Sequence, residues 1–183
     1  MKKFLLSLLL LTAPISLNFC QEFALSKGST ILTGMGSYSN HGGNLYGNAQ
    51  GKRTYNITLA STFYYFVVPR FSIGSSIAFT RDTHYNYNTF GIGPVFGYFF
   101  GDDESTLYPY LSAGIRYYSM NRNLSIAGTD IMVGGGVLIP VKKHIAFAIE
   151  AGYRKINIKN RIYRINPSGD IISIGVGISG LFF

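Results

Sequence analysis

Side chains that could carry acid–base chemistry or hold a metal ion are sparse in this sequence of 183 residues. The histidines, His41, His84 and His144, stand far apart in the chain, whereas metal ligands usually recur at spacings of a few residues. Residues 102–104 are all acidic, but a short exposed acidic stretch is more typical of a solvated turn than of a catalytic carboxylate pair. We therefore expect no catalytic residue, no metal ion and no cofactor.

Four other charged residues point to a structural role. Arg116 and Asp130 lie symmetrically on either side of residues 119–127, so a hairpin closed by that stretch would place them opposite each other on adjacent strands. Glu150 and Arg154 share one phase of the next alternating segment. Because a buried unpaired charge is costly, we expect all four side chains to form one hydrogen-bonded network in the interior.

The elements that position these residues are predicted by hydrophobic alternation with period two. In the segment 145–154, large apolar residues alternate with Ala, Gly and charged residues. The same alternation recurs along the chain after residue 53, while the segment 29–38 is expected to be a strand by its position, with its register open. The predicted strands cover residues 29–38, 54–66, 71–80, 89–100, 108–118, 128–139, 145–154 and 169 onward.

The two faces of these strands indicate which solvent surrounds them. One face carries Ile, Val, Leu, Phe and Tyr without a charge, and the other carries Gly, Ser, Thr, Ala and the charged residues. The interior of an eight-stranded barrel only just holds its own side chains, so the bulky face could hardly fit inside. Facing lipid, the same residues are in a favourable solvent, and a closed sheet leaves no edge unpaired there.

The gaps between the predicted strands alternate between long and short. They are residues 39–53, 67–70, 81–88, 101–107, 119–127, 140–144 and 155–168. Barrels of the bacterial outer membrane have short periplasmic turns and longer extracellular loops. The sequence thus predicts an all-β fold, an eight-stranded antiparallel transmembrane up-and-down β-barrel, with its long loops extracellular and its termini periplasmic.

The first twenty residues are predicted to be a signal peptide and not part of the barrel. Lys2 and Lys3 form a basic start, and a mostly apolar run follows at 4–11. We expect cleavage after Cys20, which leaves residues 21–183 as the barrel domain of an exported chain without cysteine. A lipoprotein signal and a buried N-terminal helix are the weaker alternatives.

Composition excludes two other classes of protein. Only 24 residues are charged, 16 basic and 8 acidic, whereas 28 are aromatic, 14 Tyr and 14 Phe. Low charge with abundant aromatic residues is the reverse of what disordered chains show. The basic residues are scattered and do not gather on one stripe, so we expect no nucleic acid as a partner.

Taken together, these features resemble the small outer-membrane β-barrel family of Gram-negative bacteria, the OmpA transmembrane-domain and OmpX-like proteins. The resemblance rests on the signal peptide, the alternating segments, FGIGPVFGYFF at 90–100, IAFAIEAGYR at 145–154 and the C-terminal GISGLFF. It implies that the aromatic end, Phe182 and Phe183, is the signal read by the barrel-assembly machinery during biogenesis. Phe183 departs from the family pattern, because it lies one residue out of step with the lipid-facing phase.

Basic residues gather in the long gaps and at their rims, where Asp82 is the one acid. They are Lys52, Arg53, Arg81, Arg122, Lys155, Lys159, Arg161 and Arg164. Lipopolysaccharide presents phosphates at the outer leaflet, and Arg binds phosphate through paired hydrogen bonds. We expect these residues to contact lipopolysaccharide phosphates, the alternative being that they are ordinary soluble surface charges.

The expected function is that of a monomeric outer-membrane barrel, embedded in lipid and lipopolysaccharide, with a lumen plugged by charged residues. Its extracellular loops would carry a structural or surface-interaction role, toward an external ligand that the sequence does not identify. A small-solute porin is the first alternative, since lumen charges could form a selectivity filter. A lipid A-modifying enzyme is the second, since His84 lies two residues from Asp82.

Overall fold

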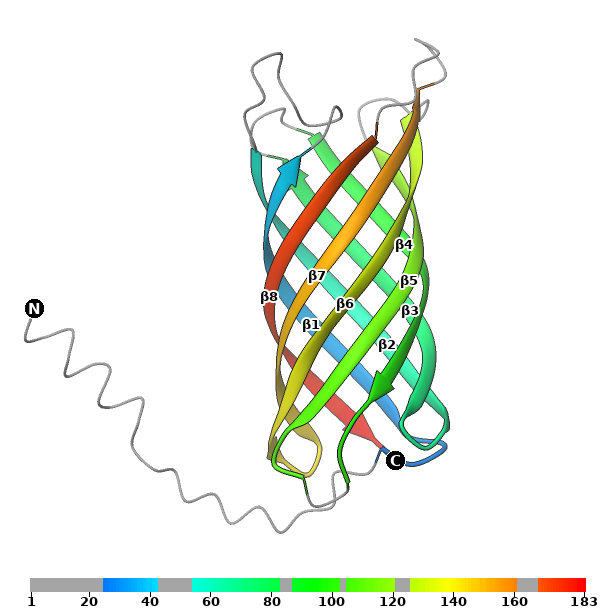
Figure 1. The fold of residues 1–183 in the computed structure, drawn as a ribbon, viewed down its shortest axis with the longest axis vertical. Helices are drawn as coiled ribbons and strands as arrows, with labels where there is room; N and C mark the ends of the chain where they lie inside the picture. Colours follow the sequence, from blue (N-terminus) through cyan, green and yellow to red (C-terminus); the bar gives the residue numbers. More distant parts are fainter. Residues whose placement is uncertain (1–24, 43–53, 83–86, 103–104, 121–125, 161–167) are drawn as a thin grey trace, which may run out of the picture.

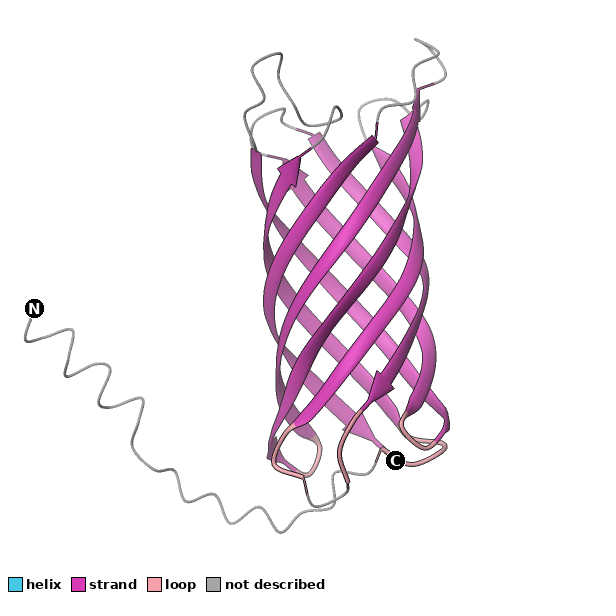
Figure 2. Ribbon diagram, viewed as in Figure 1, coloured by secondary structure: helices cyan, strands magenta, loops and turns pink. Residues whose placement is uncertain are grey.

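The alternating segments form strands that wrap into one closed sheet. The computed structural model describes residues 25–42, 54–82, 87–102, 105–120, 126–160 and 168–183. Within these ranges every regular element is a strand (Figure 2), and no helix that could cross a membrane occurs among them. The strands are β1 (Thr30–Gly42), β2 (Thr54–Val68), β3 (Phe71–Asp82), β4 (Tyr87–Phe99), β5 (Tyr108–Met120), β6 (Ile126–Lys142), β7 (Ile145–Asn160) and β8 (Ser168–Phe182).

Each strand pairs antiparallel with its neighbour in the chain, and β1 pairs with β8 to close the barrel. Figure 1 shows the strands inclined to a common axis, as closure of a twisted sheet requires. The predicted eight-stranded antiparallel up-and-down barrel is confirmed. We call the end with the tight turns at 69–70 and 143–144 and the C terminus the lower end, and the opposite end the upper end.

Several strands extend further toward the upper end than the alternation predicts. β1 continues to Gly42 and β7 to Asn160, and β6 already begins at Ile126. Backbone pairing does not need an apolar face, so polar residues continue the ladder beyond the apolar zone. Arg81 and Lys155, expected in or beside loops, therefore lie in β3 and β7.

The register of β1, which the sequence left open, is set by its pairing with both neighbours. Ile31 and Thr33 are buried in the interior, whereas Leu32 and Tyr38 are exposed on the outer surface. The Thr33 hydroxyl lies 2.8 Å from the hydroxyl of Ser179 on β8, inside the barrel. This strand was hard to read because glycines take two of its outward positions, Gly34 and Gly36, between Leu32 and Tyr38.

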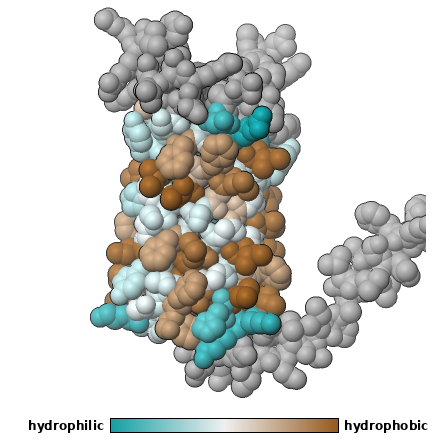
Figure 3. Space-filling model, turned by 180° about the vertical axis from the view of Figure 1, so that it is seen from behind, coloured by the Kyte–Doolittle hydropathy of each residue, from teal (hydrophilic) through white to brown (hydrophobic). Residues whose placement is uncertain are grey.

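The outer surface of the barrel is apolar around most of its height. Large exposed side chains occur on all eight strands, among them Tyr38, Leu59, Phe79, Phe96, Leu111, Ile131, Ile149 and Val176. In Figure 3 hydrophobic residues alternate with residues of intermediate hydropathy over the visible wall, and the strongly hydrophilic ones lie near the two ends. A continuous apolar belt of this kind suits hydrocarbon and not water. The predicted outward facing of the bulky residues is confirmed.

Candidate functional site

The interior of the barrel contains many buried polar and charged side chains of the described residues. Every second residue of each strand points inward, and those residues fill the lumen in three layers. We call the charged layer toward the upper end the upper tier, the cavity below it the chamber, and the apolar layer at the lower end the lower plug.

The upper tier is built around Asp130, whose side chain is fully buried. Arg116 is its direct cross-strand partner, as the symmetric placement about residues 119–127 predicts. Arg116 Nε and Nη2 donate to the two carboxylate oxygens at 3.4 and 3.3 Å. Arg154 reaches diagonally from β7, and its Nε donates to Asp130 Oδ2 at 2.6 Å.

Tyr118 completes the upper tier. Its hydroxyl donates to Asp130 Oδ2 at 3.1 Å, and its ring centre lies 5.9 Å from the guanidinium carbon of Arg116 and 5.2 Å from that of Arg154. The ring lies close to Gly91, where an added Cβ would stand 3.1 Å from it. One carboxylate thus pairs with both guanidinium groups, and the face of the Tyr118 ring stabilises part of the positive charge that remains.

The hydrogen bonds of the upper tier join neighbouring strands, and they occupy the polar atoms that catalysis would need. Arg116 Nη1 also donates to Ser76 Oγ on β3 at 3.4 Å, so the upper tier ties β3, β5, β6 and β7 together. The Asp130 oxygens already accept from arginine and tyrosine donors. A carboxylate so committed is poorly placed to act as a general base or to bind a cation.

Glu150, the fourth residue of the predicted network, stands apart from the hydrogen bonds described for the upper tier. Glu150 Oε2 accepts a hydrogen bond of 2.7 Å from the Tyr110 hydroxyl. The reason is distance along β7: four residues of strand separate Glu150 and Arg154 by roughly 13 Å. Sharing an inward phase therefore did not bring the two charges together.

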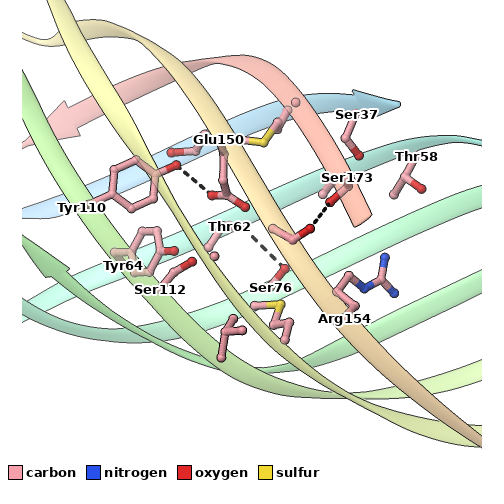
Figure 4. Close-up of a pocket in the computed structure, with 18 of the residues that line it drawn as sticks. Ser37, Thr58, Thr62, Tyr64, Ser76, Tyr110, Ser112, Glu150, Arg154 and Ser173 are labelled. Carbon is pink, nitrogen blue, oxygen red and sulfur yellow. Dashed lines mark hydrogen bonds between the residues drawn. The ribbon is translucent and has the colours of Figure 1, made fainter. Parts of the chain in front are cut away.

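A cavity of about 70 Å³, the chamber, lies between Glu150 and the upper tier. Nine of the residues that line it carry a hydroxyl group, and Figure 4 shows such side chains converging from several strands, with Glu150 and Arg154 at opposite sides. The labelled lining residues are Ser37, Thr58, Thr62, Tyr64, Ser76, Tyr110, Ser112, Glu150, Arg154 and Ser173. The volume suffices for a few water molecules, and the lining offers each one polar partners.

The lower plug is an apolar cluster that the sequence analysis did not predict. Its buried members are Leu25, Ile31, Tyr64, Phe66, Val95, Phe99, Tyr108, Tyr110, Leu138, Ala146, Ala148 and Leu181. Phe99 stands among the aromatic rings, with centroids 5.2 Å from Phe66, 5.5 Å from Tyr64 and 5.1 Å from Tyr110. The detectable signal was a group of large residues on the inward phase of the strand ends beside the lower turns.

The residues predicted to contact lipopolysaccharide are only partly described. Arg81 and Lys155 are exposed on the outward phase near the upper end, and Lys155 pairs across strands with Asp170. The side chains of Lys52, Arg53, Arg122, Lys159, Arg161 and Arg164 lie outside the described residues. The predicted signal peptide, residues 1–20, also lies outside them.

The aromatic C terminus and the one histidine whose side chain is described meet at the lower end. Phe182 is exposed on the outer surface, and Phe183 stacks on the ring of His144 with centroids 4.9 Å apart. His144 Nδ1 lies 3.1 Å from the carbonyl oxygen of Leu181. The side chain of His41 and the whole of His84 fall outside the described part of the chain.

The fold is similar to that of solved outer-membrane proteins, although no sequence comparison finds a relative. No protein-family model matches the sequence, and no curated protein matches it. Among solved structures, Neisserial surface protein A is similar at a TM-score of 0.61 and 14% identity, over 84% of this chain and 99% of that one. The outer membrane protein OprG from Pseudomonas aeruginosa is similar at a TM-score of 0.55 and 13% identity, over 87% and 98% of the two chains.

The outer membrane enzyme PagL is also similar, at a TM-score of 0.53 and 16% identity, over 79% of this chain and 97% of that one. At such identities the likeness shows the fold and nothing of the activity. The fold of the small outer-membrane β-barrels, expected from the sequence, is thereby confirmed. One of these three structures is an enzyme, so the fold alone does not assign a function.

Proposed function

We propose that this chain is a β-barrel of the bacterial outer membrane with a closed lumen, acting through its upper end as a structural or surface-interaction protein. The observation that carries the proposal is the filling of the lumen. The lower plug is apolar and tightly packed, with Phe66, Phe99 and Tyr108 almost fully buried. The upper tier holds Asp130 at zero exposure. A solute would have to displace both layers.

The alternative of a small-solute pore has less support. A selectivity filter needs charged groups that face an open path. In the upper tier the charged side chains are paired with each other instead. The chamber of about 70 Å³ is bounded by the lower plug on one side and the upper tier on the other. An eight-stranded barrel has room for packed side chains and little else.

The apolar outer belt supports a membrane position, and the turn lengths support its orientation. Tight turns at 69–70 and 143–144 occupy the lower end, which in outer-membrane barrels is the periplasmic side. The upper end would then face outward, and the exposed cations Arg81 and Lys155 would lie at the level of lipopolysaccharide phosphates. The external ligand would bind at this end.

The test is the conductance of the purified, folded barrel in a planar lipid bilayer. We expect a flat baseline with no channel steps at applied potentials of either sign. A variant in which Phe66, Phe99 and Leu138 are all replaced by Ala opens only the lower plug, so it should also show no steps, because the upper tier remains in place. Reproducible steps from the parent protein would contradict the closed lumen and favour the pore.

A further inference from the structure

The stretch before β1 is packed into the barrel. Leu25 is only 4% exposed and belongs to the lower plug, whereas Ser26, Lys27 and Gly28 are exposed. The chain reverses here, because Ser29 N donates to Ser26 O at 3.2 Å. Gly28 takes φ +93°, a conformation that residues with a side chain rarely adopt. The turn therefore presents one apolar side chain to the lumen and polar residues to solvent.

Backbone hydrogen bonds hold this turn against β2. Gly28 N donates to Phe66 O at 2.9 Å, and Phe66 N donates to Ser29 O at 3.0 Å. These bonds extend the β1–β2 ladder by a short step beyond the strand proper. The turn is thereby attached at the mouth of the lower plug, with its apolar residue aimed inward.

Arg70 connects the turn to two other segments of the lower end. Its backbone N donates to Leu25 O at 3.0 Å, and its carbonyl oxygen accepts from Phe99 N at 2.8 Å. Its guanidinium forms an ion pair with Asp102. Arg70 also has φ +68°, a left-handed conformation that is unfavourable for a residue with a side chain. Strained residues of this kind persist where the surrounding contacts require them.

We propose that residues 25–29 are a stopper that closes the lower mouth of the lumen, with Leu25 as its apolar tip. The inference rests on the closed lumen of the proposed function and adds the segment that completes it. Among the described residues, one apolar side chain and a few backbone bonds hold the stopper, whereas each strand pairs along most of its length with both neighbours. Elements held by few contacts open locally before the rest of a structure does. Withdrawal of the stopper admits water to the lower plug.

A cysteine reporter inside the lower end tests this directly. Ser72 is fully buried on the inward face of β3, so Ser72→Cys in a Cys20→Ser background places the chain's one thiol behind the stopper. The rate of labelling by a water-soluble methanethiosulfonate reagent is measured on the folded barrel in lipid vesicles permeable to the reagent. Leu25→Asp should accelerate labelling by at least roughly tenfold, which corresponds to about 1.4 kcal/mol.

Leu107→Asp is the matched control, because Leu107 lies at the same end but is 49% exposed. It introduces the same charge and should leave the labelling rate unchanged. Leu25→Ala should fall between the parent and Leu25→Asp, which keeps the test valid if the charged variant folds poorly. Folding of each variant is checked by resistance of the barrel to sodium dodecyl sulfate without heating.

Two failures are distinguishable. If the parent reporter is labelled as fast as an exposed thiol, the lumen is open and the proposed function itself is wrong. If the parent is protected and neither Leu25 variant speeds labelling, the lumen is closed without the stopper, and this inference is wrong while the proposed function stands.

Discussion

Tyr110 and Glu150 form a hydrogen bond across β6, the strand that lies between their own strands. Tyr110 belongs to β5 and Glu150 to β7, and both pair in register with Gly136 of the intervening β6. The Tyr110 hydroxyl still reaches Glu150 Oε2 at 2.7 Å, because Gly136 leaves its inward position empty. A Cβ at Gly136 would stand 2.9 Å from the Tyr110 ring and its hydroxyl, and 2.2 Å from the Ile149 carbonyl oxygen.

Gly136→Ala should therefore destabilise the barrel and weaken the Tyr110–Glu150 bond. We expect a loss of about 1–3 kcal/mol, the usual effect of overpacking a filled interior. Gly34→Ala is the control, since a Cβ there meets nothing within 4 Å, and it should change stability by less than about 0.5 kcal/mol. Urea unfolding of the barrels in lipid vesicles measures both. Equal stability of the two variants would contradict the requirement for glycine at residue 136.

Asp130→Asn should be far more damaging than its conservative size implies. It leaves Arg116 and Arg154 buried together without their counter-charge, and breaking a buried ion pair typically costs about 3–5 kcal/mol. Asp102→Asn is the control, because the Arg70–Asp102 pair is exposed and such pairs contribute at most about 1 kcal/mol. Unfolding midpoints in urea compare the two.

A compensating variant separates charge from packing in the upper tier. Replacing Arg116 and Arg154 by Met in the Asp130→Asn background removes the uncompensated cations. Part of the lost stability should return, since apolar replacement of a whole buried ion pair is often neutral. No recovery would mean that the side chains matter for their shape and hydrogen bonds more than for their charge.

Periodicity predicted the strands and their facing because each alternation reflects one physical contrast, lipid outside and packed side chains inside. The Arg116–Asp130 pairing was predictable for a related reason: hairpin symmetry fixes which residues stand opposite each other. Neither rule places a residue relative to strands further away. Arg154 reaches Asp130 diagonally, and Glu150 finds Tyr110 two strands away, so side-chain length and an intervening glycine decided those contacts.

The lower plug and the stopper were missed for a different reason. Large inward residues such as Phe66 and Phe99 lie near strand ends, and alternation predicts the face of a residue but not which side chains of other strands it contacts. Leu25 precedes the first strand altogether, and its burial depends on the Gly28 turn folding back onto Phe66. Such contacts follow from closure of the barrel, which brings the ends of distant strands together.

The cost of a charge should depend on its depth in the membrane, and two isoleucines on the outer face of β7 can test this. Ile149 and Ile145 are both exposed outward, but Ile149 lies further from the lower end. Ile149→Arg should cost about 2–4 kcal/mol, as cations near the bilayer midplane do, and Ile145→Arg about 0–1 kcal/mol, as they do near an interface. Unfolding in vesicles of defined lipid measures both. Equal costs would mean that this face does not sample a depth gradient.

The exposed cations of the upper end should bind lipopolysaccharide through its phosphates. Arg81 and Lys155 are exposed on the outward phase, on strands β3 and β7. Arg81→Gln with Lys155→Gln should reduce the lipopolysaccharide that co-purifies with the barrel. Adding Lys159→Gln, Arg161→Gln and Arg164→Gln, whose side chains lie outside the described residues, should reduce it further.

High salt should weaken binding of lipopolysaccharide by the parent protein, because exposed charges are screened within about 10 Å at 0.1 M salt. Lys142→Gln with Lys143→Gln removes the same charge from the lower end and should have no effect. If both pairs of substitutions lower co-purification equally, the interaction depends on net charge and not on cations placed at the upper rim.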